Sequence, residues 1–251
     1  MRADFYSEYY ALEDEHWWFV GRRRIFLSLL DREFESGAGN GLRALDVGCG
    51  TGTMLQHLSR YARVQGIDAD PQAVAFCHER GLTEVSRIDS GVLPFAGGSF
   101  DLVTAFDVLE HVEDDVGLLR EMYRVANPGA VLLVSVPAYR FLWGPQDEIS
   151  HHHRRYVAGE LRRRITTAGF HLERVSYFNT LLFPAIAGLR LGRRLVRRRG
   201  PQEVKSDFGL TPPGLVNRIL ARLFGMEAAL LQRVNLPVGV SVLALGRRPH
   251  A

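Results

Sequence analysis

Three glycines and two acids lie at a spacing that suits the binding of an adenosine-containing cofactor. Gly48, Gly50 and Gly52 form a loop that directly follows a short apolar run. Asp46 lies two residues before the loop, and Asp68 ends the next apolar run, 22 residues after Asp46. Glycines let a ligand approach the backbone where a helix begins, and an acid about 20 residues further on can hold both ribose hydroxyls.

The carboxylate of Asp46 helps to choose between classes of cofactor. A dinucleotide site presents backbone amides to a pyrophosphate, in the spacing G-x-G-x-x-G. Here the spacing is G-x-G-x-G and an anion precedes it, which would repel a pyrophosphate and suits an amino group or a sulfonium. S-adenosylmethionine has a ribose at one end and a positive amino-acid portion at the other, so it is the predicted cofactor, with S-adenosylhomocysteine as product. A nicotinamide-dependent oxidoreductase is the alternative that this spacing disfavours.

Two histidines are candidates for removing a proton from a methyl acceptor. The sulfonium already drives methyl transfer, so the protein mainly positions the acceptor and takes its proton. Histidine suits this task because it titrates near neutral pH. His111 and His152 follow the fourth and fifth predicted strands, at the edge where ligands bind such sheets. We expect His152 to be the base or an acceptor contact, and His111 to be catalytic or to shape the cofactor pocket.

The elements that must position these residues alternate between strands and helices. Apolar runs predict seven strands, at 43–47, 64–68, 84–88, 100–106, 130–136, 171–177 and 238–245. Helices are predicted at 4–12, 16–35, 53–61, 71 onward, 114–126 and 157–168. This alternation predicts an α/β fold with a doubly wound, seven-stranded, mostly parallel sheet. We expect the last two strands to pair as an antiparallel hairpin at the sheet edge.

A single domain over residues 1–251 accounts for this order of elements. Residues 1–40 would form a helical cap and residues 41–179 the cofactor-binding core. Residues 180–236 would form a helical insertion on the acceptor side, and residues 237–251 would hold the last strand. A sheet needs only a short hairpin between its last two strands, so the insertion is expected to be functional.

Composition excludes several classes of protein. The 251 residues are 46% hydrophobic and 24% charged, which is typical of a globular domain. Two cysteines do not make a disulfide framework. The start of the chain does not read as a signal peptide, and the apolar stretch 175–189 is too short to span a bilayer. These features favour a cytoplasmic protein.

Charge divides unevenly along the chain. Residues 1–150 hold 13 Arg and 23 Asp or Glu, whereas residues 151–251 hold 18 Arg or Lys and five acids. A basic second region suggests an anionic partner. Within residues 180–233, apolar stretches alternate with arginines, which is typical of a helix lying on an anionic membrane surface or of a cap with a solvated basic face.

Further segments extend the pattern beyond the glycine loop. Ile88–Ser90 and Leu93–Val103 look like an adenine-contacting loop and the strand after it, and Phe106–Val112 and Asn127–Ala130 match later motifs. Together they resemble the class I S-adenosylmethionine-dependent methyltransferases of the type 11/type 12 group, over about residues 40–179. The resemblance implies the Rossmann-like methyltransferase fold, with N-terminal helices and a helical insertion before the last strand.

The resemblance also implies which residues contact the cofactor. They are Asp46, Gly48, Cys49, Gly50, Gly52, Asp68, Ala69, Asp89, Ser90 and Phe106. Asp46 and the loop would hold the methionine portion, Asp68 the ribose, and Asp89 the adenine amino group. Cys49 would offer a small side chain against the ligand rather than a nucleophile.

The acceptor side resembles one subgroup more locally. Asp147, His152, Arg154, Arg155 and Tyr156 match its D-x-x-x-x-H-x-R-R-Y stretch, and they would line the acceptor side, where arginine could clamp a carboxylate or phosphate. The subgroup's N-terminal aromatics correspond to residues 16–19. Trp17 and Trp18 are expected to bind substrate as part of an aromatic lid, although packing on the sheet is the alternative.

A metal site is not expected from the sequence. His151, His152 and His153 are adjacent, and adjacent residues do not converge on one ion in a helix or strand. Only His151 and His153 could share a face, with Asp147 or Glu148 as a third ligand. Metal-dependent catechol methyltransferases use acidic and amide ligands, and no such set is evident here.

The function predicted from the sequence is methyl transfer to oxygen or nitrogen of a small-molecule or lipid-like acceptor. A nucleic-acid substrate is not expected, because the residues after the fourth strand read Phe106-Asp-Val-Leu rather than a base-methylating N/D-P-P-Y/F motif. Residues 180–233 are a possible peripheral membrane contact. A methyltransferase-like binding protein without catalysis is a second alternative, and an intact glycine loop argues against it.

Overall fold

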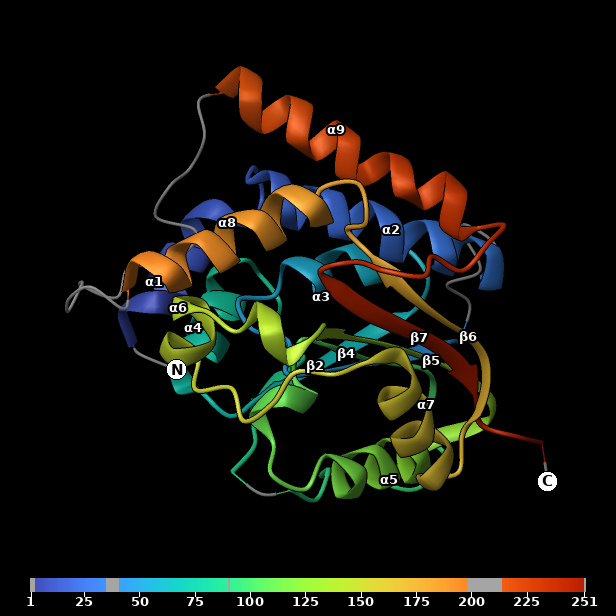
Figure 1. Cartoon of the computed structure of the whole chain (residues 1–251). Coiled ribbons are helices and arrows are strands. Elements are labelled where there is room, and N and C mark those ends of the chain that lie inside the picture. The colour runs from blue at the N-terminus through green and yellow to red at the C-terminus, as the bar shows by residue number, and fades with distance from the viewer. Residues whose placement is uncertain (1–2, 35–40, 90, 198–213, 251) are drawn as a thin grey trace.

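The computed structural model describes residues 3–34, 41–89, 91–197 and 214–250. They form a seven-stranded sheet with the strand order β3-β2-β1-β4-β5-β7-β6 (Figure 1). The first five strands pair in parallel, and β7 is antiparallel to both β5 and β6. The strands are β1 (Arg43–Val47), β2 (Arg63–Asp68), β3 (Val85–Arg87), β4 (Phe100–Phe106), β5 (Ala126–Pro137), β6 (His171–Phe178) and β7 (Ser241–Arg247). The predicted doubly wound, mostly parallel sheet is confirmed.

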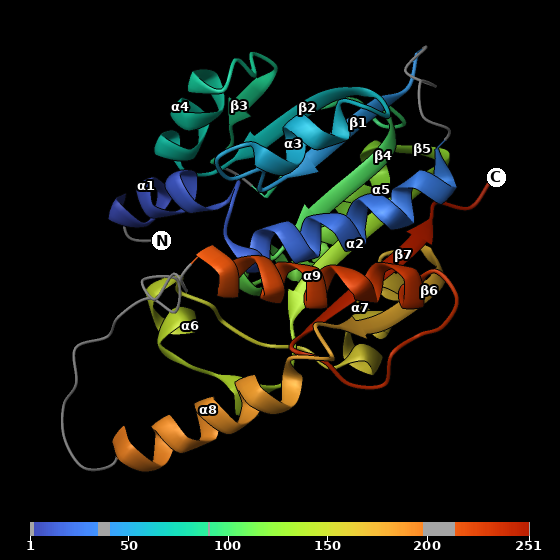
Figure 2. The same cartoon turned by 90° about the horizontal axis from the view of Figure 1, so that it is seen from above.

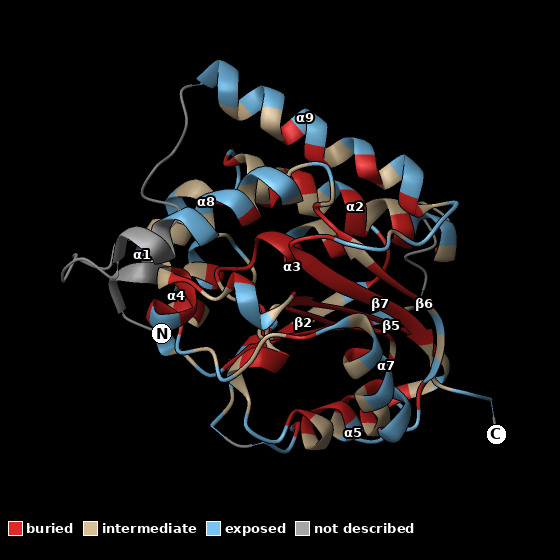
Figure 3. Cartoon of the chain, in the orientation of Figure 1, coloured by how far each residue is buried: buried red, intermediate tan, exposed pale blue. Residues whose placement is uncertain are grey.

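Helices cover both faces of this sheet, so its central strands are apolar on both sides. Alternate residues of one strand enter different cores: Leu102 contacts the layer that contains α2, and Val103 contacts the layer that contains α5 and α7. Figure 1 shows α2 and α9 above the sheet and α5 and α7 below it, and Figure 3 shows the buried strands between them. The helices are α1 (Ala3–Leu12), α2 (Trp17–Glu33), α3 (Thr53–Leu58), α4 (Pro71–Glu79), α5 (Asp115–Val125), α6 (Pro145–Ile149), α7 (Ala158–Thr167), α8 (Phe183–Arg197) and α9 (Gly214–Leu231), with 3₁₀ turns η1 (Leu109–His111) and η2 (Arg140–Leu142).

Several boundaries differ from the sequence prediction, including that of the last strand, which is Ser241–Arg247 rather than 238–245. β5 begins at Ala126 rather than at residue 130, because the predicted turn Asn127–Gly129 is part of a bulged strand. Gly129 adopts a φ of +82° there, and its N–H donates to the carbonyl of Arg248. α3 ends at Leu58 rather than at residue 61. Tyr61 lies beyond the helix, and its hydroxyl donates to the carbonyl of Leu27 in α2.

The described parts of the insertion between β6 and β7 are helical. α9 lies along α2, as the two views agree (Figures 1 and 2). The approach is close at Gly21, where an added Cβ would lie 2.7 Å from Phe224 Cβ. α8 lies apart from α9 in Figure 2, near α6. The arginines of residues 180–233 include Arg198 and Arg199, which lie outside the described residues. Among the described residues, no helix is both long and apolar enough to cross a bilayer.

Candidate active site

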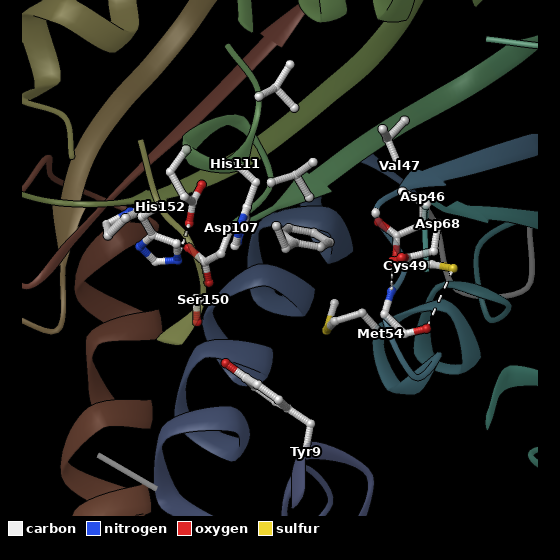
Figure 4. A pocket seen from close by; sticks show the side chains of 18 of the residues that line it. Tyr9, Asp46, Val47, Cys49, Met54, Asp68, Asp107, His111, Ser150 and His152 are labelled. Atoms are coloured by element: carbon white, nitrogen blue, oxygen red, sulfur yellow. Dashed lines mark hydrogen bonds and ion pairs between the residues drawn. The ribbon is translucent and has the colours of Figure 1, made fainter. Parts of the chain in front are cut away.

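A single large cavity of about 1400 Å³ lies where β1, β2, β4 and β5 end. It is larger than the roughly 300–1,000 Å³ of most small-molecule sites, so it has room for two ligands. The glycine loop and the end of β2 form one side of it, and Glu110, His111 and His152 form another. Figure 4 shows Asp46, Cys49 and Asp68 facing His111 and His152 across the cavity.

The glycine loop has the geometry of a ligand cradle. Gly48, Gly50 and Gly52 all have positive φ, between +56° and +88°. A Cβ at Gly50 would meet no described atom within 4 Å, so this position is open toward the cavity. The carboxylate of Asp68 accepts hydrogen bonds from the N–H groups of Gly50 and Asp70, each at 2.9 Å. Asp68 is therefore fixed beside the loop, where a ribose would lie.

Gly52 has a different role from the other two glycines. A Cβ there would lie 2.6 Å from Leu82 Cδ1 and 2.9 Å from Cys77 Sγ. It is not among the described residues that line the cavity. Its absent side chain lets the start of α3 pack against the α4–β3 region, and the cofactor contact expected of Gly52 stays a prediction.

Asp46 is a buried acid at the wall of the cavity. Its side chain is 2% exposed and accepts a 2.6 Å hydrogen bond from the Thr104 hydroxyl. Burial raises the pKa of Asp46 to about 7. A cation placed next to this carboxyl would favour its charged form, which is the arrangement expected for the methionine end of the cofactor.

The remaining predicted cofactor residues are distributed along the same wall. Cys49, Ala69, Asp89 and Phe106 all line the cavity. Asp89 stands at its mouth, with a side chain that is 70% exposed and 2.6 Å from the Arg87 guanidinium. Phe106 stacks on Phe26, with ring centroids 4.5 Å apart. Ser90 lies outside the described residues.

His152 is held by a buried carboxylate. Its Nδ1 lies 2.9 Å from Asp147 Oδ1. Arg155 donates to both oxygens of Asp147, at 2.7 and 3.0 Å, and the N–H of Gly144 donates at 2.7 Å. Burial alone would raise the pKa of Asp147, but the bond with His152 and the charge of Arg155 hold this pKa well below its usual range. The ionised carboxylate accepts a hydrogen bond from Nδ1 of His152, so in the neutral form of the ring Nε2 carries the lone pair.

His111 and Glu110 lie directly beside that lone pair. The His111 ring is 4.5 Å from the His152 ring and perpendicular to it. Burial, with a further contribution from His152, lowers the pKa of His111 to about 3, so His111 is neutral at ordinary pH. Glu110 Oε1 lies 4.0 Å from Nε2 of His152. Burial raises the pKa of the Glu110 carboxyl well above its usual range.

Three of the predicted substrate contacts are placed elsewhere. Asp147, Arg154 and Tyr156 are not among the described residues that line the cavity. Arg154 pairs with Asp115 at 3.2 Å, and the fully buried Tyr156 donates its hydroxyl to the same Asp115 at 2.7 Å. These contacts fasten the loop to α5. Asp147 contacts His152, and of this motif only His152 and Arg155 line the cavity.

The predicted aromatic residues form part of the cavity wall. Trp17, Trp18 and Phe19 all line it. The backbone N–H of Trp17 donates to Asn217 Oδ1 at 2.7 Å, which ties the start of α2 to α9. The Arg22 guanidinium lies 4.2 Å from the centre of the Trp18 ring. The insertion contributes Ile186, Leu189 and Arg190 from α8 and Leu220 from α9.

Sequence reasoning missed several residues of the site. Tyr6 and Tyr9 of α1 line the cavity, and Arg22 forms a 2.5 Å ion pair with Asp107, whose φ is +58°. Glu110 was read only as part of the motif Phe106–Val112. An acid directly before a histidine, a few residues after an apolar strand, is the signal that could have identified it.

Comparisons with known proteins agree with this geometry. Residues 45–134 match a family model described as a methyltransferase domain. A Mycolicibacterium smegmatis protein named "Probable S-adenosylmethionine-dependent methyltransferase" is 32% identical over 167 residues, which is 65% of this chain and 63% of that protein. A ubiquinone biosynthesis O-methyltransferase of Xanthomonas oryzae is 36% identical over 102 residues, 38% of this chain and 43% of that one. The chain thus matches less than two thirds of the length of these relatives.

A structural comparison extends the likeness to nearly the whole chain. A Haloferax volcanii protein solved in complex with the Trm112 methyltransferase activator superposes with a TM-score of 0.63. The superposition covers 99% of this chain and 96% of that one at 19% identity, so it shows the fold.

Proposed function

We propose that this chain, which carries a class I S-adenosylmethionine-dependent methyltransferase domain of the type 11 group, methylates a small-molecule or lipid-like acceptor at oxygen or nitrogen. One observation carries the proposal: a single cavity joins the glycine loop and Asp68 to the paired His152 and Asp147. S-adenosylmethionine supplies a methyl group on a sulfonium when bound. The chain must hold that cofactor, exclude water and take up a proton.

The cofactor side would be divided among three carboxylates. Asp68, already fixed by the N–H groups of Gly50 and Asp70, would accept hydrogen bonds from the ribose hydroxyls. The buried Asp46 would face the positive methionine end. Asp89 lies at the open mouth, where the adenine amino group would reach it.

On the acceptor side, Nε2 of His152 would take the acceptor proton. Asp147 holds the ring and stabilises the imidazolium that forms. The acceptor oxygen or nitrogen forms a bond to the methyl carbon, and the carbon–sulfur bond breaks with its electrons left on sulfur. The products are the methylated acceptor and neutral S-adenosylhomocysteine.

The walls of the acceptor side suit a partly apolar molecule. Trp17, Trp18 and Ile186 supply apolar surface, and Arg155 and Arg190 supply positive charge near the histidines. The apolar part of an acceptor would lie against the aromatic wall. The Arg155 guanidinium is engaged by Asp147 and the carbonyl of Ala138, so it would contribute through its charge rather than by direct contact. The relative from Xanthomonas oryzae is named for ubiquinone biosynthesis, which fits an acceptor of this kind.

A lipid-like acceptor would also explain the exposed apolar residues of the insertion. On α9, Leu215, Ile219 and Met226 are well exposed, next to the exposed Arg218 and Arg222. Such a face suits peripheral contact with an anionic membrane through residues 180–233. Sedimentation with anionic liposomes is expected at low salt and is expected to be lost at high salt and in Leu215→Glu. Absence of binding at low salt would leave these helices as a cap only.

The proposal is tested by following S-adenosylhomocysteine formation by mass spectrometry with a panel of hydroxylated and amine acceptors. The mass of any small molecule that co-purifies with the chain guides the choice of panel. Turnover with at least one acceptor, lost without S-adenosylmethionine, is expected. Cofactor binding without turnover across the panel would favour the alternative of a methyltransferase-like binding protein.

A further inference from the structure

Three potential metal ligands meet on the acceptor side of the cavity. Glu110, His111 and His152 each offer one ligand atom, and these atoms lie within 4.8 Å of one another. The backbone enforces the meeting, because the N–H of His153 donates to the carbonyl of Glu110 at 2.8 Å. The loop that follows α6 is thereby fastened onto η1.

The free nitrogen of His152 faces another acceptor. Asp147 lies at Nδ1, so the atom pointing toward Glu110 is Nε2, 4.0 Å from Oε1. At this distance the two atoms form no direct hydrogen bond, so the space between them can hold a proton or a cation. A carboxylate that orients one imidazole nitrogen while the other binds a metal is a common arrangement in metal sites.

Glu110 has no other source of compensation among the described residues. Its side chain has no exposed surface, and neither carboxylate oxygen has a hydrogen-bond partner there. A buried carboxyl without a hydrogen-bond partner is neutralised either by a proton or by a cation beside it. The nearby guanidinium of Arg155 is used by Asp147 and the carbonyl of Ala138, and that of Arg22 by Asp107.

His111 completes the set in the same manner. Its ring lies 4.5 Å from the ring of His152, and one of its nitrogens lies within 4.8 Å of the ligand atoms of Glu110 and His152. The two imidazoles and the carboxylate thus present three potential ligand atoms to one point. All three residues line the cavity, so an ion there would keep open positions for a ligand.

We propose that Glu110, His111 and His152 bind one divalent transition-metal ion. Two imidazoles and one carboxylate suit Mn²⁺, Fe²⁺, Co²⁺ or Zn²⁺ better than Mg²⁺ or Ca²⁺, which prefer oxygen ligands. Metal–ligand bonds of about 2.0–2.2 Å place neighbouring ligand atoms about 3 Å apart. Side-chain rotations that move each ligand atom by about 1–2 Å would bring the three atoms to this separation. No metal site was expected from the sequence, because only the neighbours of residues 151–153 were candidate ligands there. In the structure His152 lies beside Glu110 and His111 of η1.

The role of the ion rests on the proposed function, although its binding does not. A metal ion in the cavity would bind the acceptor oxygen and lower its pKa, so that the acceptor loses its proton to solvent before methyl transfer. His152 would then act as a ligand, and its lone pair would no longer be a free base.

The test is calorimetric titration of the full-length, chelator-treated chain with Mn²⁺, Co²⁺, Zn²⁺ and Mg²⁺. Binding of one transition-metal ion per chain is expected, with weaker or undetectable binding of Mg²⁺. Glu110→Gln and His152→Ala should each weaken binding at least 10-fold. His153→Ala removes an exposed neighbouring imidazole and should leave the affinity unchanged. The absorption spectrum of the Co²⁺ form should report nitrogen coordination and should change in His152→Ala.

Two results would overturn the inference. One is the absence of stoichiometric binding of every ion, and the other is equal binding in wild type and in the isosteric Glu110→Gln variant. Either result would mean that a proton, rather than a metal ion, lies among Glu110, His111 and His152. S-adenosylhomocysteine titration of the same metal-free samples separates the two proposals, because cofactor binding without metal binding contradicts only this inference.

Discussion

Nδ1 of His152 lies 2.9 Å from Oδ1 of Asp147, a carboxylate with no exposed surface. This hydrogen bond fixes the orientation of the His152 ring, because the ring can turn only by breaking a charged hydrogen bond. Arg155 and the N–H of Gly144 fix the carboxylate in turn. The loop after β5 therefore presents one nitrogen lone pair to the cavity.

Replacement of His152 is expected to affect turnover and to leave the cofactor in place. His152→Ala should lower kcat by about 10²–10⁴-fold, since either the base or a metal ligand is lost. Affinity for S-adenosylhomocysteine should be unchanged, because the glycine loop lies across the cavity. His153→Ala is the matched control. Full turnover in His152→Ala would remove this residue from the mechanism, and a change in KM alone would make it a substrate contact.

Loss of the Asp68 carboxylate is expected to weaken cofactor binding. Each hydrogen bond to a charged group contributes about 1.5–3 kcal/mol, so Asp68→Ala should weaken S-adenosylhomocysteine binding by about 10- to 150-fold or more. Glu79→Ala removes an exposed acid of α4 and should have no effect. Calorimetry that finds equal affinities in Asp68→Ala and wild type would contradict the placement of the ribose.

The buried Asp46 should make cofactor binding depend on pH. Its pKa of about 7 means that the charged form grows as pH rises through neutrality. Affinity for cationic S-adenosylmethionine should therefore rise between about pH 6 and pH 8, and Asp46→Asn should remove that part of the dependence. A variant that keeps the full wild-type dependence would assign the pH effect to another group.

The same group has the opposite effect on the stability of the ligand-free protein. The folded carboxyl keeps its proton up to about pH 7, whereas its unshifted value is 3.8. Between these values the native state binds more protons than the unfolded state, so the contribution of Asp46 to stability falls as pH rises. Thermal unfolding of wild type and Asp46→Asn across this range should show that difference in slope.

The contact between Gly21 and Phe224 should be sensitive to a single methyl group. A Cβ at Gly21 would overlap a ring with no exposed surface, so Gly21→Ala should lower the free energy of unfolding by about 1–3 kcal/mol. Gly188→Ala, on the exposed side of α8, meets no described atom and should be neutral or stabilising by up to about 1 kcal/mol. In a Phe224→Ala background the cost of Gly21→Ala should shrink. If the losses in unfolding free energy from Gly21→Ala and Phe224→Ala are additive, the two residues are not in tight contact.

Much of the fold could be predicted because local patterns determine it. The apolar run in β1 and the proline at the start of α4 each predict an element without reference to distant residues. The start of β5 could not be predicted in this way. Its first residues join the strand only because Arg248, at the other end of the chain, accepts the Gly129 N–H.

The cofactor side of the site was also more predictable than the acceptor side. Asp68 lies at a spacing that β–loop–α geometry requires. Tyr156 shares a motif with His152 but points to Asp115 in the interior, which motif spacing does not reveal. Glu110 can be recognised as a site residue only in the folded chain, where the loop after α6 brings His152 beside it. Contacts of this kind depend on tertiary structure.

The most direct test of the account is calorimetric titration of the full chain with S-adenosylhomocysteine and, in parallel, with NAD. Asp46 before the glycine loop and Asp68 at the end of β2 are both buried acids that line the cavity. Saturable binding of one S-adenosylhomocysteine per chain is therefore predicted, with no heat of binding for NAD. Binding of NAD without binding of S-adenosylhomocysteine would contradict the account and support the oxidoreductase alternative.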